Sequence, residues 1–86
     1  MTTADSQRII EVIRSAGSVK AEKGDFNQII FSFHPDSGMY SMERKYWQSE
    51  TGQVVFENKS LSEGDLQALI EALYSSEEDF IADFGV

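Results

Sequence analysis

The chain has 86 residues, which is enough for one domain with one modest hydrophobic core. Apolar residues make up 41% of it and aromatic residues 12%, which excludes a disordered chain despite the net charge of −8. This charge disfavours direct contact with nucleic acids and anionic membranes, and the absence of cysteine excludes disulfides, thiolate catalysis and cysteine-ligated metals.

The first residues, Met1 to Asp5, lack the basic and then apolar pattern of a secretory signal. The most apolar stretch, Ile29 to Phe33, is interrupted by a serine and is too short to span a bilayer. We therefore expect residues 1–86 to form a single cytoplasmic domain that makes no membrane contact.

Residues 5–16 are predicted to form the first helix, with Asp5 or Thr3 as its cap. Its apolar residues recur at helical spacing on one face: Ile9, Val12, Ile13 and Ala16, with Ile10 on the flank. Gly17 suits the left-handed position just past the end of a helix. The polar segment from Ser18 to Gly24 is predicted to be a loop.

Three strands are predicted next, at residues 26–34, about 39–48 and 53–58. Residues 35–38 (Pro-Asp-Ser-Gly) are typical of a turn, and residues 50–52 (Glu-Thr-Gly) fit a three-residue hairpin loop. The strands therefore form an antiparallel meander.

The two turns also predict the register of the meander. In the first hairpin His34 pairs with Met39, so that the apolar side chains of both strands share one face: Ile29, Phe31, Phe33, Tyr40 and Met42. In the second hairpin Ser49 pairs with Gln53, which places Tyr46 opposite Phe56 on that same face. The opposite face would then carry three favourable pairs: Glu43 with Lys59, Lys45 with Glu57, and Trp47 with Val55.

A second helix is predicted to begin after Ser62, its N-cap, with Asp65 in the capping-box position. Its apolar stripe consists of Leu66, Leu69, Ile70, Leu73 and Tyr74. Ser76 can cap a further short helix with Phe80, Ile81 and Phe84 on its apolar face. The predicted fold is α+β: helix, three-stranded antiparallel meander, helix, and a short C-terminal helix or arm, with the helices on one sheet face.

No residue pattern predicts catalysis, and we expect a protein that is not an enzyme. His34, Asp36 and Ser37 supply the three residue types of a catalytic triad, but side by side, where a turn explains them better. The run Glu77-Glu78-Asp79 lacks the spacing of a calcium loop and is typical of a helix start. The glycines are isolated and form no phosphate-binding loop. No catalytic residue, metal site or cofactor is therefore predicted.

The uncovered face of the sheet is the first candidate binding surface. Trp47 would lie there with Met39, Ile30 and Val55, which is more apolar than a solvent-exposed face requires. Either a partner or a second copy of the chain binds this face, or a terminal segment of the chain covers Trp47. RNA stacking on Trp47 is disfavoured, because Glu43 and Glu57 would neutralise Lys45.

The C-terminal third is the second candidate surface. Residues 60–86 carry seven acids and no base, hence −7, whereas residues 1–59 carry eight acids and seven bases, hence −1. Such a segment is either a solvated acidic face or a docking surface for a basic protein. In the docking interpretation four acids supply the charge, Glu77, Glu78, Asp79 and Asp83, and two aromatics supply the anchors, Phe80 and Phe84.

The sequence thus favours a non-enzymatic inhibitor of the immunity-protein, antitoxin or phage-encoded type. Its acidic C-terminal surface would block a basic, nucleic-acid-handling protein such as a nuclease or DNA-binding protein. The alternative is a homodimer or assembly module that uses the open sheet face around Trp47. An enzyme or an accessory subunit of one is the third hypothesis, and it rests on His34 alone.

Overall fold

The computed structural model describes residues 1–24 and 26–86. Within them, one helix is followed by a four-stranded antiparallel sheet and then by two further helices. The elements are α1 (Thr3–Ala16), β1 (Ser18–Lys23), β2 (Asn27–His34), β3 (Met39–Gln48), β4 (Gln53–Leu61), α2 (Glu63–Leu73) and α3 (Glu77–Phe84). The α+β class is confirmed. The number of strands was wrong, and the order of elements differs from the prediction accordingly.

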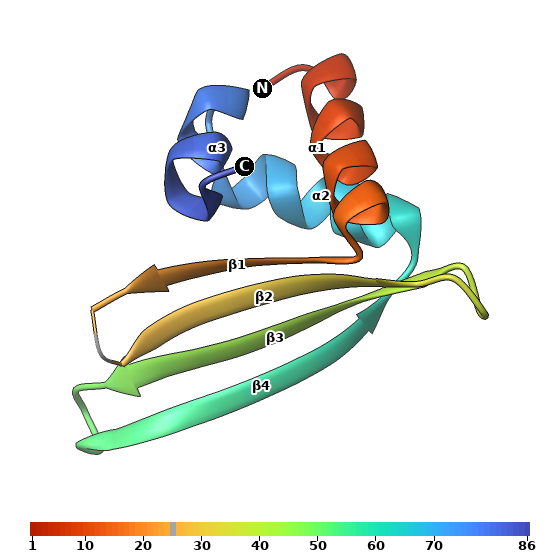
Figure 1. Ribbon diagram of the computed structural model, residues 1–86. Helices are drawn as coiled ribbons and strands as arrows, with labels where there is room; N and C mark the ends of the chain where they lie inside the picture. Colours follow the sequence, from red (N-terminus) through yellow and green to blue (C-terminus); the bar gives the residue numbers. More distant parts are fainter. Residues whose placement is uncertain (25) are drawn as a thin grey trace.

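The strands lie side by side in their order along the chain, from β1 to β4, and the three helices form a layer on one side of them (Figure 1). The helices are nearest β1 and β2, while β4 lies farthest from them (Figure 1). Every buried strand residue points to the helix side: Val19, Ala21, Phe31, Tyr40, Met42 and Leu61. We call the other side the open face.

Helix α1 begins earlier than predicted because Thr2, and neither Thr3 nor Asp5, is its N-cap. The Thr2 hydroxyl accepts a hydrogen bond from the Asp5 amide, and the Asp5 carboxylate accepts one from the Thr2 amide, which completes a capping box. This bond from the Thr2 amide holds the pKa of Asp5 below its ordinary value. Gly17 ends the helix with φ of 80°, as its position predicts.

Strand β1 occupies the segment that was predicted to be a loop. It pairs with β2 in an antiparallel register that places Val19 opposite Phe31 and Ala21 opposite Ile29. Val19 and Ala21 point inward and are each 4% exposed. The intervening residues are polar because an edge strand with one buried face needs only every second side chain to be apolar.

The register of the first hairpin is confirmed, with His34 opposite Met39 and Phe31 opposite Met42. The second hairpin is shifted by one residue from the prediction, because its loop has four residues and Gln48 rather than Ser49 pairs with Gln53. Gly52 adopts φ of 65° at the end of this loop. A shift of one residue exchanges the faces of a whole strand. The predicted pairs of the second hairpin are therefore wrong: Tyr46 with Phe56, Glu43 with Lys59, Lys45 with Glu57, and Trp47 with Val55.

Helices α2 and α3 are capped by the serines that the sequence indicated. The Ser62 hydroxyl accepts from the Asp65 amide at 3.1 Å, and the Ser76 hydroxyl accepts from the Asp79 amide at 3.2 Å. The C-terminal segment is therefore a helix packed against the sheet. Among the described residues, no helix is both long and apolar enough to cross a bilayer.

Candidate binding surfaces

The turn residues that resemble a triad do not converge. The His34 ring nitrogen Nε2 lies 2.9 Å from the hydroxyl of Ser41 on β3, while the Ser37 hydroxyl lies 3.4 Å from the His34 carbonyl. Asp36 forms no side-chain hydrogen bond within the described part of the chain. In the same residues, no group of three or more histidines and acids is close enough to hold a metal ion. The structure thus assembles no acid–base pair around His34.

The acidic C-terminal segment is partly neutralised by bases from the N-terminal third of the chain. Arg8 on α1 binds Glu77, with Arg8 Nη2 2.9 Å from Glu77 Oε2, and Lys23 Nζ on β1 lies 3.0 Å from Asp83 Oδ2. Arg14 pairs with Glu63 in the same way. Two of the four acids predicted to bind a partner are therefore held in ion pairs, and these pairs tie α3 to α1 and β1.

Phe80 and Phe84 lie in the core and not on the surface. Phe80 is 0% exposed and Phe84 is 7% exposed. Their rings stack on each other at 4.2 Å between centroids, and both approach Phe31 of the central strand β2. The prediction that these two side chains act as exposed anchors for a partner disagrees with this packing, because a partner would have to open the core to reach them.

Three carboxylates nevertheless meet at a shallow depression between α2 and α3, which we call the acidic hollow. Glu71, Asp79 and Asp83 line it together with Leu73 and Tyr74 and with one base, Lys23. Glu71 and Asp79 are exposed and form no ion pair within the described residues. Burial and the nearby Asp83 carboxylate raise the pKa of the Tyr74 phenol above its ordinary value.

Glu78 lies beside this hollow, exposed on the first turn of α3. Three apolar side chains that the sequence assigned no binding role are exposed on the same helices and at the chain end: Leu73 at 48%, Ile81 at 42% and Val86 at 47%. The apolar stripes of α2 and α3 showed which side of each helix packs inward, but not how many of its residues are covered. Which residues of each helix stay exposed depends on where the neighbouring helix packs, and the local sequence does not determine this.

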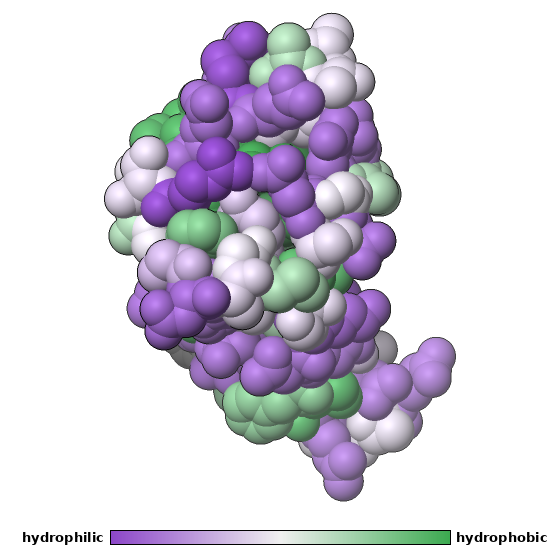
Figure 2. Space-filling view, turned by 90° about the vertical axis from the view of Figure 1, so that its right-hand side faces the viewer, coloured by the Kyte–Doolittle hydropathy of each residue, from purple (hydrophilic) through white to green (hydrophobic). Residues whose placement is uncertain are grey.

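The open face carries an aromatic cluster at the end of the sheet away from the Pro35–Gly38 turn. Phe26, Trp47 and Phe56 are 52%, 46% and 75% exposed. Phe26 and Trp47 are in contact, with ring centroids 5.6 Å apart. Phe56 reaches this face because of the one-residue shift of β4, and the shift moves Val55 and Glu57 to the helix side. Figure 2 shows hydrophobic side chains gathered low on the molecule, over the sheet, below a belt of hydrophilic ones.

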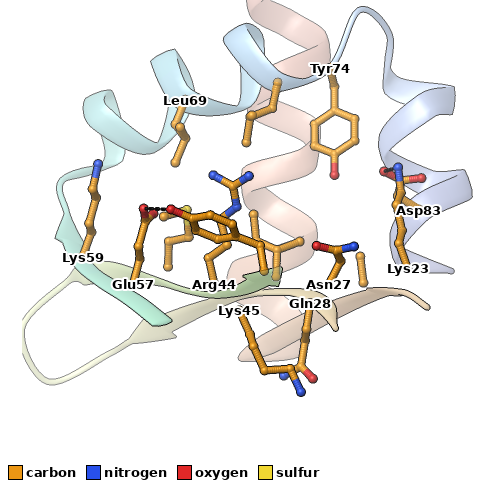
Figure 3. Close-up of a pocket in the computed structure, with 15 residues that line it drawn as sticks. Lys23, Asn27, Gln28, Arg44, Lys45, Glu57, Lys59, Leu69, Tyr74 and Asp83 are labelled. Carbon is orange, nitrogen blue, oxygen red and sulfur yellow. Dashed lines mark hydrogen bonds and ion pairs between the residues drawn. The ribbon is translucent and has the colours of Figure 1, made fainter. Parts of the chain in front are cut away.

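A groove opens between α2 and the part of β3 and β4 that the helices leave uncovered (Figure 3). Its volume is about 370 Å³. We call it the α2 groove; Leu69, Leu73 and Tyr74 line it on the α2 side, and Met42, Arg44, Tyr46, Glu57 and Lys59 line it on the sheet side. The Lys23–Asp83 pair closes one end.

The polar side chains of the α2 groove are only partly paired with each other. The Tyr46 hydroxyl donates to Glu57 Oε1 at 3.2 Å, and this bond, together with burial, raises the pKa of Tyr46. The Arg44 guanidinium lies over the Tyr46 ring, 4.5 Å from its centroid. None of the ion pairs formed within the described residues involves Arg44, Lys45 or Lys59.

Sequence reasoning missed the α2 groove. Lys59 was assigned to the open face opposite Glu43, and only the observed pairing places it on the helix side with Arg44. The sequence did contain one signal, because Arg44 interrupts the apolar alternation of Tyr40, Met42 and Tyr46. Comparisons of the chain with protein-family models, curated proteins and solved structures gave no match.

Proposed function

We propose that this chain is a non-enzymatic protein-binding domain that presents the acidic hollow to a basic partner protein. The observation that supports the proposal is the meeting of Glu71, Asp79 and Asp83 around the exposed Leu73. An apolar side chain surrounded by carboxylates offers desolvated contact area together with charge selectivity. Residues 60–86 carry −7 of the net charge of −8, so the long-range field also favours a cationic partner.

The finer proposal is a role as an inhibitor, of the immunity-protein, antitoxin or phage-encoded kind. A basic, nucleic-acid-handling protein exposes a cationic cleft for its substrate, and an acidic domain can occupy that cleft in place of the polyanion. The buried aromatics Phe80 and Phe84 take a different part in this proposal from the one expected from the sequence. They fix α3 in place, and Leu73 and Ile81 supply the exposed apolar contacts.

Charge reversal in the hollow tests the proposal. In the double variant Glu71→Lys/Asp79→Lys, affinity for a basic protein captured with this chain should fall at least about tenfold, because opposite charges at an interface are replaced by like charges. The dependence of affinity on salt concentration should also become shallower. Binding would be measured by calorimetry at graded ionic strength.

The matched control is Glu43→Lys/Glu50→Lys, which changes the net charge equally on the open face and in the β3–β4 loop. It should leave affinity within about threefold, because exposed charges away from an interface contribute little. Equal losses in the two double variants would show that only overall charge matters, and would contradict binding at the acidic hollow.

A second candidate function is self-association through the open face, and the exposed cluster of Phe26, Trp47 and Phe56 favours it. Exposed aromatic patches of this kind are typical of interfaces. Light scattering over a concentration series should then show a dimer that Trp47→Ser/Phe56→Ser converts to a monomer. Leu73→Ser, which also removes an exposed apolar side chain but on α2, should leave the dimer intact. A wild-type chain that stays monomeric at the highest concentration would exclude this function.

A further inference from the structure

The α2 groove combines an apolar lining with several basic side chains. Leu69 and Leu73 give it an apolar wall on α2, and Met42 gives it an apolar floor on β3. Figure 3 shows Leu69 and Tyr74 extending from α2 toward the sheet, with Arg44 rising from the sheet to meet them. Ligand pockets typically combine mostly apolar walls with a few converging polar groups, in volumes of about 300–1,000 Å³. The volume of about 370 Å³ is at the lower end of that range.

The charge in this groove is opposite in sign to that of the molecule. Arg44 on β3 and Lys59 on β4 both point to the helix side, opposite Glu57 and Met42 respectively, and neither forms an ion pair within the described residues. The nearest carboxylate on the floor, Glu57, already accepts the hydrogen bond of Tyr46. Across the described chain, Arg8, Arg14, Lys20 and Lys23 each have an acidic partner. Three bases of the described residues have no such partner, Arg44, Lys45 and Lys59, and all three line the groove of a strongly acidic protein.

The geometry of Arg44 indicates which anion fits. Its guanidinium lies over the Tyr46 ring at 4.5 Å, which supports the cation on one face and leaves its N–H edge free. A free guanidinium edge pairs with the two oxygens of a carboxylate in a bidentate way. The Tyr74 phenol, which points into the groove in Figure 3, adds a further polar group to its lining.

We propose that the α2 groove binds a small free carboxylic acid with an apolar chain, whose carboxylate pairs with Arg44 and whose chain lies against Leu69 and Leu73. Lys59 adds a second positive charge at the sheet edge. The groove adjoins the acidic hollow and shares Leu73, Tyr74 and the Lys23–Asp83 pair with it. Arg44 and Lys59 line only the groove, so the proposal does not rest on the partner protein proposed above.

A simpler role for the same charges is protection of the sheet edge. Charged side chains that point inward on an edge strand discourage pairing with another chain, and β4 is an edge strand. The two roles predict different results. Edge protection requires only a charge of either sign near β4, whereas carboxylate binding requires the guanidinium of Arg44 and the apolar wall of α2.

Octanoate is a suitable probe, with octanamide as its uncharged analogue. Titration followed by backbone amide NMR should show saturable shifts at Leu69, Leu73 and Arg44. Octanamide should bind at least about tenfold more weakly, since a hydrogen bond between charged groups is roughly twice as strong as a neutral one and the groove would lose the ion pair as well. Arg44→Gln should weaken octanoate binding about tenfold or more, and Lys59→Gln less, because its ammonium is a single point charge.

Lys20→Gln is the matched control. Lys20 is an exposed base on β1, the register directs it to the open face opposite Ile30, and it does not line the α2 groove. It should bind octanoate within about twofold of wild type, because exposed charges on the far side of a sheet are screened. All three substituted residues are at the surface, so circular dichroism should show that each variant folds.

Any of four titration results would overturn the proposal. They are an absence of saturable shifts, equal affinity for octanamide, equal losses in Arg44→Gln and Lys20→Gln, and shifts confined to Phe26 and Trp47 on the open face. Tight binding of a peptide through its C-terminal carboxylate, without binding of octanoate, would also overturn it. The groove would then belong to a protein ligand and not to a free acid.

Discussion

Phe80→Ala is expected to lower the free energy of unfolding by about 3–5 kcal/mol, the range for truncation of a buried phenylalanine. The Phe80 ring is fully buried, stacks on Phe84 at 4.2 Å and meets the edge of Tyr74 at 5.3 Å. A small domain has a total stability of about 5–15 kcal/mol, so the loss would remove a large part of it. Urea unfolding followed by circular dichroism measures the change.

Ile81→Ala is the control for this substitution. Ile81 is the next residue on α3 and is 42% exposed, so its truncation should cost less than about 1 kcal/mol. Similar losses in the two variants would mean that α3 does not pack on the sheet through Phe80. Phe80 would then be available to a partner, as the sequence alone had indicated.

Val19→Asp is expected to be at least as damaging, with a loss of several kcal/mol at pH 7. Val19 is 4% exposed, faces the helix layer and is paired with Phe31, so the carboxylate would be buried without a cation. Burial raises the pKa of a carboxyl in the folded state. The folded chain therefore tolerates the protonated carboxyl better than the carboxylate. The loss of unfolding free energy relative to wild type should shrink as the pH is lowered from 7 toward 4.

Ser18→Asp adds the same charge one residue earlier, at an exposed position on the open face of the sheet. It should cost no more than about 1 kcal/mol, chiefly from its place just beyond the C-terminal end of α1. Thermal unfolding of both variants at pH 4 and pH 7 provides the comparison. If Val19→Asp were as stable as Ser18→Asp, the segment would behave as the loop that its composition suggests.

The parts of the fold that depend on local chemistry could be predicted from the sequence. The Pro35–Gly38 turn determined one hairpin register, and Ser62 and Ser76 marked the starts of two helices. The register of the second hairpin was less well determined by the sequence, because Val54, Val55 and Phe56 are consecutive apolar residues and either register buries some of them. The length of the loop before Gly52 decided the register, and it placed Phe56 on the open face.

Features that depend on distant contacts could not be predicted. Strand β1 exists because β2 offers it a free edge, and only Val19 and Ala21 in it are apolar and buried. The candidate sites show the same limit. Helical spacing identified Phe80 and Phe84 as one apolar face, but whether that face meets solvent or Phe31 depends on how α3 packs. Predicting the α2 groove would likewise require both the register of β4 and the position of α2.

The sheet has one consequence for the order of folding. Each strand pairs with its neighbour along the chain, so β1 to β4 can form as three successive hairpins with short closing loops. The apolar side of this sheet, including Phe31 and Tyr40, is covered in part by α2 and α3, which follow the sheet in the chain. During synthesis that side stays open until residues 63–84 have left the ribosome. Until then, the nascent chain depends on α1 alone to shield an apolar surface that is prone to aggregation.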